Sequence, residues 1–354
     1  MTKRKRHRRK LHQTFPGIIV KIYKKLSADP ELSEWGILVP LLKSRATQIC
    51  EEFEINKKLK GKIGDLGDYL LNKNDLIKAG HNVKFVEDLF SGNDELIDPH
   101  LQETYELVKP DGSFNRFDPT LKKRRFHELF MCQLAEASNS YQCAKKAVSE
   151  NENIFYLSGG MHHAMTFGGR GFCLLNDAII AIRKLQSEKY IKSAWVIDVD
   201  VHKGDGTAEM SKDDSSIITF SIHMKNGWPL DMGDGPWKTP SNIDVEIEDE
   251  DNDSYLINLR EGLHQLSEKF DRPDFIFVNL GGDPYEKDVL KSSELIQLSR
   301  EQMLQRNKMV YRFIKDIGSP SLWTMGGGYG EHSFETYVDF FKSISDQVRG
   351  ADIF

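Results

Sequence analysis

Short apolar runs recur in the second half of the chain, and each has about the length of a β-strand. The runs are largely apolar on both faces and are separated by helix-like or loop-rich segments. Continuous apolar strands that alternate with helices are typical of a parallel sheet covered on both sides. We therefore predict an α/β fold on a mainly parallel sheet, with strands at residues 154–157, 194–199, 217–222, 275–280 and 321–325.

Before residue 150 the pattern is mostly helical. An isoleucine-rich run at 18–23 predicts an opening strand, and helical periodicity covers 41–53, with Pro40 suited to its first turn, and 124–148. Residues 90–120 are rich in Asp, Pro, Gly and Asn, which predicts an extended loop. The acidic run at 246–253 is interpreted as a solvated loop, because it lacks the spaced oxygens and the glycine of a calcium site.

Glycine and polar residues occupy the point where each of the five strands ends. In open parallel sheets, ligands bind at the carboxyl ends of the strands, so these segments are expected to converge on one crevice. They comprise Gly159-Gly160-Met161-His162-His163, residues 198–206, Ser221-Ile222-His223, Gly281-Gly282-Asp283 and Gly326-Gly327-Gly328-Tyr329.

The second of these segments has the spacing of a metal corner. Asp198, Asp200 and His202 are two residues apart, so an extended chain points them to the same side. Asp283 arrives from another strand end and could supply a further carboxylate. One histidine and two aspartates with an open position suit catalytic zinc, although one carboxylate could instead orient a histidine. The alternative for this motif alone is a solvated strand end.

The tandem pair His162-His163 follows two glycines. Adjacent buried imidazoles repel each other when both are charged, so their protonation must be coupled and set by partners. Asp198 and Asp205 are available for that role. The pair could serve as general base and acid beside a metal-activated water, or it could be two surface histidines in a glycine turn.

Aromatic residues accompany these motifs. Tyr329 follows three glycines and could donate to an oxyanion during carbonyl hydrolysis, or it could be an ordinary packing residue. Phe172 and Trp228 could line a narrow apolar channel, or they could belong to the core. A serine hydrolase is disfavoured because the chain has no Gly-x-Ser-x-Gly elbow. Together the motifs favour a metal-assisted hydrolase that acts on a carbonyl.

Composition and charge narrow the setting. The four cysteines are scattered, no apolar run reaches the roughly 18 residues that span a bilayer, and no apolar signal segment follows the basic start. These features predict an intracellular, cytoplasmic protein with no membrane contact. The net charge is −6, and residues 3–10 hold seven positive charges, so the remainder carries −13. Nucleic-acid binding is thus expected only through residues 1–11, a basic tail interpreted as disordered or, alternatively, as a nuclear import signal.

Five motifs, in their order and separations, resemble the zinc-dependent histone deacetylase family of the arginase/deacetylase superfamily. They are Gly159–His163, residues 171–177 (GFCLLND), residues 198–206, Gly281–Asp283 and Gly327–Tyr329. The strong resemblance covers about residues 120–345, and the first 110 residues match loosely. Residues 33–36 (SEWG) and 283–286 (DPYE) are similar to the class IV and bacterial branch.

This resemblance implies a three-layer arginase-like fold, with a mainly parallel eight-stranded sheet between helices, in one catalytic domain over residues 12–354. It implies one catalytic Zn²⁺ and a structural K⁺ close to it. His163 would be the leading general base and acid, His162 its electrostatic companion, and Tyr329 the holder of the oxyanion. The implied sets are Asp200, His202 and Asp283 for zinc; Asp198, Asp200 and Ser221 for potassium; Asp198 and Asp205 behind the two histidines; and Gly160, Phe172, Trp228, Leu290 and Gly328 along the substrate channel.

Three positions depart from the family pattern. Lys203 stands where the family usually has His or Gln, and its side chain is expected to face away from the metal. The rim aspartate of many lysine deacetylases has no clear counterpart, with Asp111 and Asp118 as candidates. Leu290 occupies the position of the acidic gatekeeper of polyamine-selective members, which favours acyl-lysine over acetylpolyamine.

The predicted function is hydrolysis of an acetyl or other acyl group from the side-chain amine of lysine in proteins or peptides. The alternatives are deacetylation of an acetylpolyamine or another small amide, a two-manganese ureohydrolase on the same fold, and a non-catalytic module that reads acyl groups. No pattern in the sequence indicates an oligomeric state.

Overall fold

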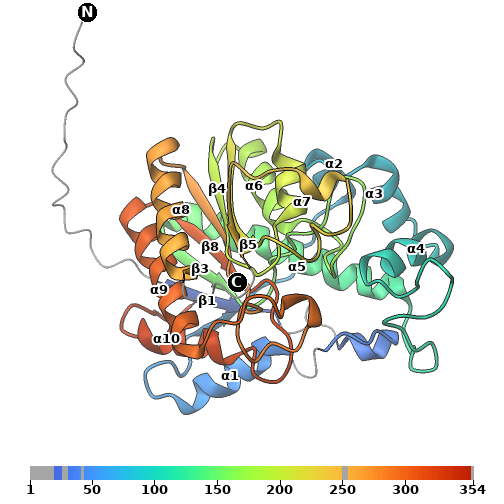
Figure 1. Cartoon of the computed structure of the whole chain (residues 1–354), viewed down its shortest axis with the longest axis horizontal. Helices are drawn as coiled ribbons and strands as arrows, with labels where there is room; N and C mark the ends of the chain where they lie inside the picture. Colours follow the sequence, from blue (N-terminus) through green and yellow to red (C-terminus); the bar gives the residue numbers. More distant parts are fainter. Residues whose placement is uncertain (1–19, 26–30, 41–43, 249–253, 352–354) are drawn as a thin grey trace, which may run out of the picture.

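The computed structural model describes residues 20–25, 31–40, 44–248 and 254–351, so the basic tail lies outside the described residues. An eight-stranded sheet forms its centre, with the strand order β2-β1-β3-β8-β7-β4-β5-β6 and every neighbouring pair parallel (Figure 1). The strands are β1 (Val20–Lys24), β2 (Ile63–Asp65), β3 (Asn153–Tyr156), β4 (Ala194–Asp198), β5 (Ile217–Met224), β6 (Ile243–Ile247), β7 (Phe275–Asn279) and β8 (Ser321–Thr324).

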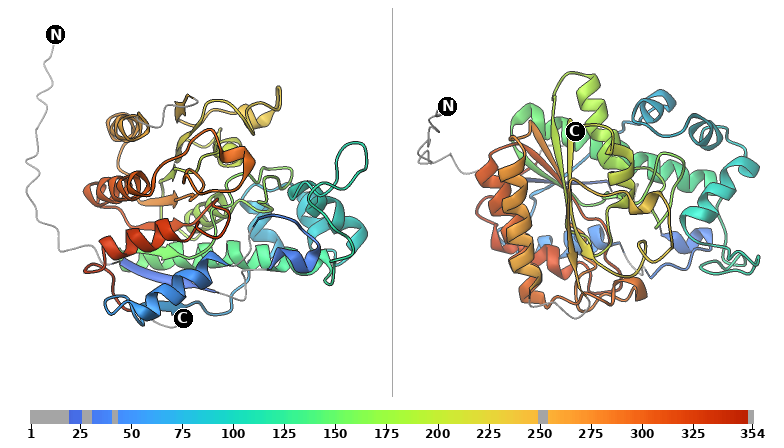
Figure 2. Two further views of the ribbon diagram at one scale, coloured as in Figure 1. Left: turned by 60° about the horizontal axis from the view of Figure 1, so that its bottom comes forward. Right: turned by 45° about the horizontal axis from the view of Figure 1, so that its top comes forward.

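Helices cover both faces of this sheet (Figure 2). Side chains alternate along each strand, so Val196 of β4 packs into one buried cluster and Ile197 into the other. The first cluster also contains residues of α2 (Lys73–Lys78), α3 (Val83–Leu89), α4 (Asp94–Thr104), α5 (Phe126–Glu150), α6 (Asp177–Ser187) and α7 (Asp205–Ser211). The second contains residues of α1 (Arg45–Ile55), α8 (Tyr255–Lys269), α9 (Arg300–Ile317) and α10 (Glu335–Ser343). The predicted three-layer α/β fold is confirmed.

Most of the predicted elements are present with shifted ends, and three predictions are wrong. The segment 90–120 contains α4, whose first turn is capped by the Asn93 side chain, which accepts from Glu95 N. The first turn of α1 follows Ser44, which caps it through Thr47 N, so Pro40 is not its opening residue. The acidic run at 246–253 was predicted to be a loop, but residues 246–247 belong to strand β6; residues 249–253 lie outside the described residues.

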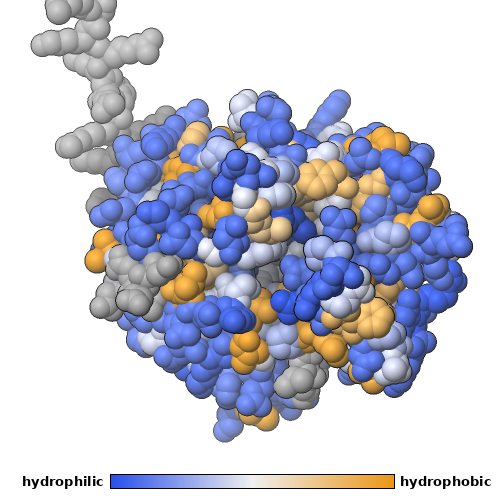
Figure 3. All heavy atoms as spheres, turned by 45° about the vertical axis from the view of Figure 1, so that its right-hand side comes forward, coloured by the Kyte–Doolittle hydropathy of each residue, from blue (hydrophilic) through white to orange (hydrophobic). Residues whose placement is uncertain are grey.

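The surface is polar where it is displayed. On the face drawn in Figure 3, hydrophilic side chains predominate and apolar side chains form small, separate groups. Among the described residues, no helix combines the length and the apolar character needed to cross a bilayer.

Candidate active site

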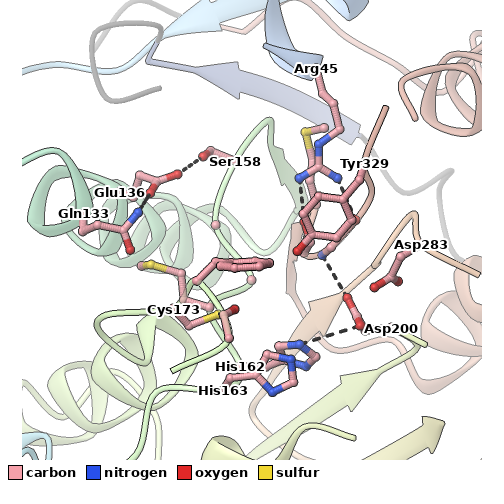
Figure 4. A pocket seen from close by; sticks show the side chains of 18 of the residues that line it. Arg45, Gln133, Glu136, Ser158, His162, His163, Cys173, Asp200, Asp283 and Tyr329 are labelled. Atoms are coloured by element: carbon pink, nitrogen blue, oxygen red, sulfur yellow. Dashed lines mark hydrogen bonds and ion pairs between the residues drawn. The ribbon is translucent and has the colours of Figure 1, made fainter. Parts of the chain in front are cut away.

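The sheet order brings the predicted strand ends together. Strands β3, β8, β7 and β4 are consecutive in the sheet, and their carboxyl ends carry His162 and His163, Tyr329, Asp283 and the Asp198–His202 segment respectively. The two histidines, Asp200 and Asp283 are buried, and they line a common cavity (Figure 4). The separate motifs of the sequence therefore form one site.

Asp200, His202 and Asp283 form the metal corner. One potential ligand atom from each lies within 4.8 Å of the others, and this is the one such group of three in the part of the chain that the structure describes. The Nδ1 atom of His202 lies 3.3 Å from Asp200 Oδ1 and 3.2 Å from Asp283 Oδ2. Burial and the charge of Asp200 raise the pKa of Asp283 to about 7. Two buried carboxylates this close need a cation, so the donor set fits a divalent metal.

Main-chain donors orient both carboxylates. Asp200 Oδ2 accepts from Gly327 N at 2.9 Å, and Asp283 Oδ1 accepts from Val201 N at 3.1 Å. Each aspartate is therefore fixed by the loop of a different strand. In both, the other oxygen faces the imidazole of His202.

The histidine pair is held by two separate carboxylates. His162 Nδ1 lies 2.7 Å from Asp198 Oδ2, and His163 Nδ1 lies 2.6 Å from Asp205 Oδ1. The ring centroids of the two histidines are 3.8 Å apart. His162 Nε2 lies 3.7 Å from Asp200 Oδ1, so it is His163 whose Nε2 is left for the cavity side (Figure 4).

The two imidazoles differ in protonation. Burial opposes the charged form of His162, but the charges of Asp198 and Asp200 outweigh it and raise the pKa to about 9. Burial and the positive charges of His162 and His202 hold the pKa of His163 well below its usual value. Neutral His163 beside cationic His162 can therefore accept a proton.

Tyr329 stands opposite this pair. Its backbone N–H donates to Asp288 Oδ2 at 2.7 Å, and its ring meets Phe172 edge-on at 5.9 Å between centroids. Burial and the charge of Asp283 raise the pKa of the Tyr329 phenol well above 10. The hydroxyl therefore stays protonated and can act as a donor.

Most of the predicted channel residues line the approach to this site. A narrow pocket of about 120 Å³ is bordered by Phe172, Trp228, Leu290 and Tyr329, and it reaches His163 and His202. The Trp228 ring lies edge-on to His163 at 4.5 Å. Gly160 lines the larger inner cavity, as predicted for the channel. The prediction for Gly328 is wrong: this residue lines neither space, and a β-carbon at its position would meet Arg45 Nη1 at 2.7 Å.

The departures from the family pattern have a structural outcome. Lys203 donates to Asp244 Oδ1 at 2.6 Å and so faces β6, as predicted. Asp111 is exposed and Asp118 is half-buried; they accept from nearby Ser113 and Thr120, and neither lines the pocket. The potassium site stays a prediction. Two of its predicted residues, Asp198 and Ser221, are partners in the β4–β5 register.

The rim and the inner cavity contain residues that the motifs did not indicate. Glu106 and Arg116 form an ion pair of 3.2 Å at the pocket, and Arg116 lies 5.3 Å from the Phe172 ring centroid. No local signal marks this pair, because its segment reads as a loop. The inner cavity, of about 340 Å³, is further lined by Arg45, Gln133, Glu136 and Ser158.

These inner residues are tied to the site's own loops. Arg45 donates to Gly326 O at 2.6 Å and to Gly327 O at 2.7 Å. Glu136 accepts from Ser158 Oγ and, at 2.7 Å, from Gln133 Nε2. Because Arg45 opens α1 and Glu136 lies in α5, helices distant in sequence build the floor of the cavity.

Known proteins share this architecture. Histone deacetylase 2 of Arabidopsis thaliana is 27% identical over 207 residues, which cover 58% of this chain and 51% of that protein. Human histone deacetylase 1 is 25% identical over 330 residues, which cover 82% of this chain and 66% of that protein. An uncharacterized protein from Picosynechococcus is 33% identical over 176 residues, or 49% and 55% of the two chains. The chain thus spans between about half and two thirds of the length of these relatives.

Solved structures agree on the fold. The structure of an HDAC homologue from Aquifex aeolicus has a TM-score of 0.67 at 18% identity, covering 93% of this chain and 84% of that one. The HDA15 HD domain has a TM-score of 0.66 at 17% identity, covering 94% and 91%. The family model described as the histone deacetylase domain matches residues 41–343. This chain therefore belongs to the histone deacetylase family of hydrolases.

Proposed function

We propose that the protein is a zinc-dependent deacylase that removes an acetyl or another acyl group from the side-chain amine of lysine. The observation that carries the proposal is the pairing of a neutral His163 with a protonated phenol, Tyr329, across a buried metal corner. A base and a donor on opposite sides of a Lewis acid are what amide hydrolysis requires. An HDAC homologue of the same fold, 18% identical, has been solved in complex with SAHA.

Asp200, His202 and Asp283 would hold the zinc, because their donor set of two carboxylates and one imidazole suits it and leaves a position open. Zinc bound there would polarise the acyl carbonyl and make water a stronger acid. Asp198, in contrast, is engaged with His162, with Asn279 Nδ2 at 3.0 Å and with Asp200 N at 3.1 Å. We therefore place Asp198 behind the histidine rather than among the ligands.

The chain's own groups would then move the protons. His163 donates its Nδ1–H to Asp205, so its Nε2 can take a proton from the attacking water. Tyr329 would donate to the oxygen of the acyl carbonyl as negative charge develops on it. His163 would return the proton to the departing amine, and a carboxylate and a free lysine side chain would be the products. A charged His162, held by Asp198, would oppose protonation of His163 and so favour the return of the proton.

The pocket shape favours a lysine side chain as the leaving group. Phe172 and Trp228 flank a narrow apolar passage that suits four methylene groups, and Leu290 offers no negative charge to a polyamine. A ureohydrolase would need a second cluster of carboxylates, and no second metal-binding group of three occurs among the described residues. A non-catalytic reader would not need both histidines and the tyrosine.

The test is hydrolysis of a fluorogenic acetyl-lysine peptide by the purified protein, with chelator and with zinc restored. We expect chelator-sensitive release that zinc restores, and loss of turnover in His163→Ala. Acetylpolyamines tested in parallel should be poor substrates, and a preference for them would move the proposal to a small-amide deacetylase. Stoichiometric zinc without release from any acylated lysine would overturn the proposal.

A further inference from the structure

The carboxylate behind His163 is asymmetrically satisfied. Asp205 Oδ1 accepts from His163 Nδ1 at 2.6 Å and from Gly206 N at 2.9 Å. Its other oxygen, Oδ2, is fully buried and accepts no hydrogen bond. The group that compensates this oxygen is the guanidinium of Arg170, whose Nη1 lies 3.5 Å away.

Arg170 is itself held by aromatic rings. Its guanidinium carbon lies 5.2 Å from the Trp228 ring centroid and 4.9 Å from that of Trp237. Nη2 lies 2.9 Å from Met232 Sδ, and the side chain is 14% exposed. Cation–π contacts of this kind are strongest where the cation is partly desolvated, so the arginine has a defined position between two indoles.

The backbone turn that follows Arg170 connects it to the channel. Arg170 N donates to Cys173 O, and Cys173 N donates to Arg170 O, both at 2.9 Å. Within this turn Gly171 has φ +53° and Phe172 has φ +67°. A β-carbon on Gly171 would collide with Trp228 and His163. One tight turn therefore places the arginine behind the catalytic histidine and Phe172 in the channel wall.

The positive charge of Arg170 favours the ionised form of Asp205. Burial raises the pKa of Asp205 to about 6, and the charge of Arg170 opposes that rise. A protonated Asp205 would be a poor acceptor for the Nδ1–H of His163, and the imidazole would lose its fixed tautomer and orientation. A buried carboxylate oxygen left without the arginine would carry the full cost of its desolvation.

We propose that Arg170 is a positioning residue for deacylation, which holds Asp205 as an oriented anion behind His163 and fixes Trp228 against the same imidazole. The channel wall and the general base would then act as one unit. This inference rests on the proposed deacylase function and deepens it, because it assigns a third member to the His163–Asp205 pair.

The central experiment is a double-mutant cycle on turnover of the acetyl-lysine peptide. Arg170→Gln should lower kcat about 10- to 100-fold, the usual effect of removing a group behind a catalytic residue, with KM and zinc content nearly unchanged. In the Asp205→Asn background the same substitution should cost little more, because the residue through which it acts is already disabled. Arg170→Lys, which keeps the charge, should restore part of kcat.

Two further variants protect the test. Arg124→Gln removes a guanidinium that also lies over an indole, 4.4 Å from Trp35, and pairs with Glu34 and Glu128 away from the pocket. It should leave kcat unchanged. Trp237→Leu keeps the arginine but removes one of the two indole rings that hold it, so its loss of kcat should be intermediate. This variant carries the test if Arg170→Gln does not fold.

The outcomes separate the two proposals. Full kcat in a folded Arg170→Gln protein, or an equal loss in the wild-type and Asp205→Asn backgrounds, would overturn the inference and leave the deacylase function intact. A wild-type protein that binds zinc but hydrolyses no acylated lysine, whatever the acyl group, would overturn the proposed function, and the role of Arg170 in it as well.

Discussion

The phenol of Tyr329 is the hydroxyl that the proposed mechanism offers to a developing oxyanion. Tyr329→Phe should lower kcat about 10²- to 10³-fold, as removal of an oxyanion donor does, while peptide KM and zinc content stay close to those of the wild type. Steady-state kinetics and metal analysis would measure this. Tyr190→Phe, at an exposed tyrosine, is the matched control, and equal losses in both variants would contradict the role of Tyr329.

His81 gives the fold a pH dependence that is separate from catalysis. Its Nδ1 lies 3.1 Å from Met165 O and its Nε2 accepts from Asn176 N at 3.2 Å, so the neutral ring uses both nitrogens. Burial lowers its pKa to about 4. The unfolded chain binds this proton near pH 6.5, so the stabilisation is complete above 6.5 and is lost as pH falls towards 4, by about 3 kcal/mol.

Urea unfolding between pH 4.5 and 7.5 would test this contribution. We expect His81→Gln to be less stable at pH 7.5 but to lose less of its free energy of unfolding on acidification than the wild type. His264→Gln, at an exposed histidine, should keep the wild-type slope. An unchanged slope in His81→Gln would show that other groups dominate the acid transition.

At the residue level, the sequence indicated the candidate catalytic and metal-binding residues but not the arginines that support them. His163, Asp200 and Tyr329 lie in local motifs that each follow a predicted strand, so the convergence of ligands at the carboxyl ends of parallel strands predicted a common crevice. Arg170 and Arg45 act across the fold, on carboxylate or carbonyl groups 35 and more than 280 residues away. Such partners leave no periodic signal, and only the three-dimensional arrangement identifies them.

At the scale of elements, helix α9 is hydrogen-bonded to the ends of the two strands that precede the candidate metal ligands. Its Arg306 is fully buried and donates to Val199 O at 2.9 Å, just past β4, and to Leu280 O at 3.4 Å, just past β7. Arg306→Gln should lower the free energy of unfolding by about 1–3 kcal/mol, because the buried carbonyl of Val199 loses its donor and that of Leu280 keeps only the Tyr337 hydroxyl, at 3.3 Å. Zinc affinity should fall about tenfold or more, since Asp200 and Asp283 follow these carbonyls.

Arg312→Gln supplies the control on the same helix, because Arg312 is exposed. Urea unfolding and zinc titration of both variants would measure the difference. Equal stability of the two variants would mean that water or another donor satisfies the carbonyls of Val199 and Leu280, and that α9 does not brace the site through Arg306.

Sequence patterning missed both edge strands of the sheet and helix α4. Strands β2 and β6 are the edge strands, and each pairs with one neighbour. In β6 the buried Ile243 and Ile247 alternate with the acidic Asp244 and Glu246, so no continuous apolar run marks it. In α4 the turn-forming residue Asn93 is a helix cap, which composition alone does not distinguish from a loop.

For the whole molecule, the described part of the first hundred residues packs on the same sheet and around the same cavity as the motifs. Their sequence resembles the family loosely, yet β1 pairs with β3, and Arg45 reaches the glycine loop after β8. The match of the family model from residue 41 to 343 agrees with this placement. The α/β architecture was predictable because it follows from strand and helix alternation, whereas the reach of the N-terminal helices into the cavity was not.

The metal corner should couple zinc binding to the stability of the whole fold. Without a cation, Asp200 and Asp283 repel each other in a buried site. Zinc that bound the folded chain and not the unfolded one would raise the free energy of unfolding by about 2.7 kcal/mol at a concentration of 100 Kd.

Thermal unfolding of chelated protein with and without added zinc would measure this coupling. Asp200→Asn should abolish the zinc-induced rise in unfolding temperature. Asp244→Asn, which lies outside the metal corner, should retain it. Without metal, Asp200→Asn loses the attraction of this carboxylate to His162 and His202 as well as its repulsion of Asp283, so the comparison rests on the zinc-induced shift. The same zinc shift in both variants would place the stabilising ion elsewhere, and the metal corner would then lose its assignment. A zinc-induced rise in stability that Asp200→Asn lacks and Asp244→Asn retains is therefore the signature that links the charge arrangement of the site to a bound metal.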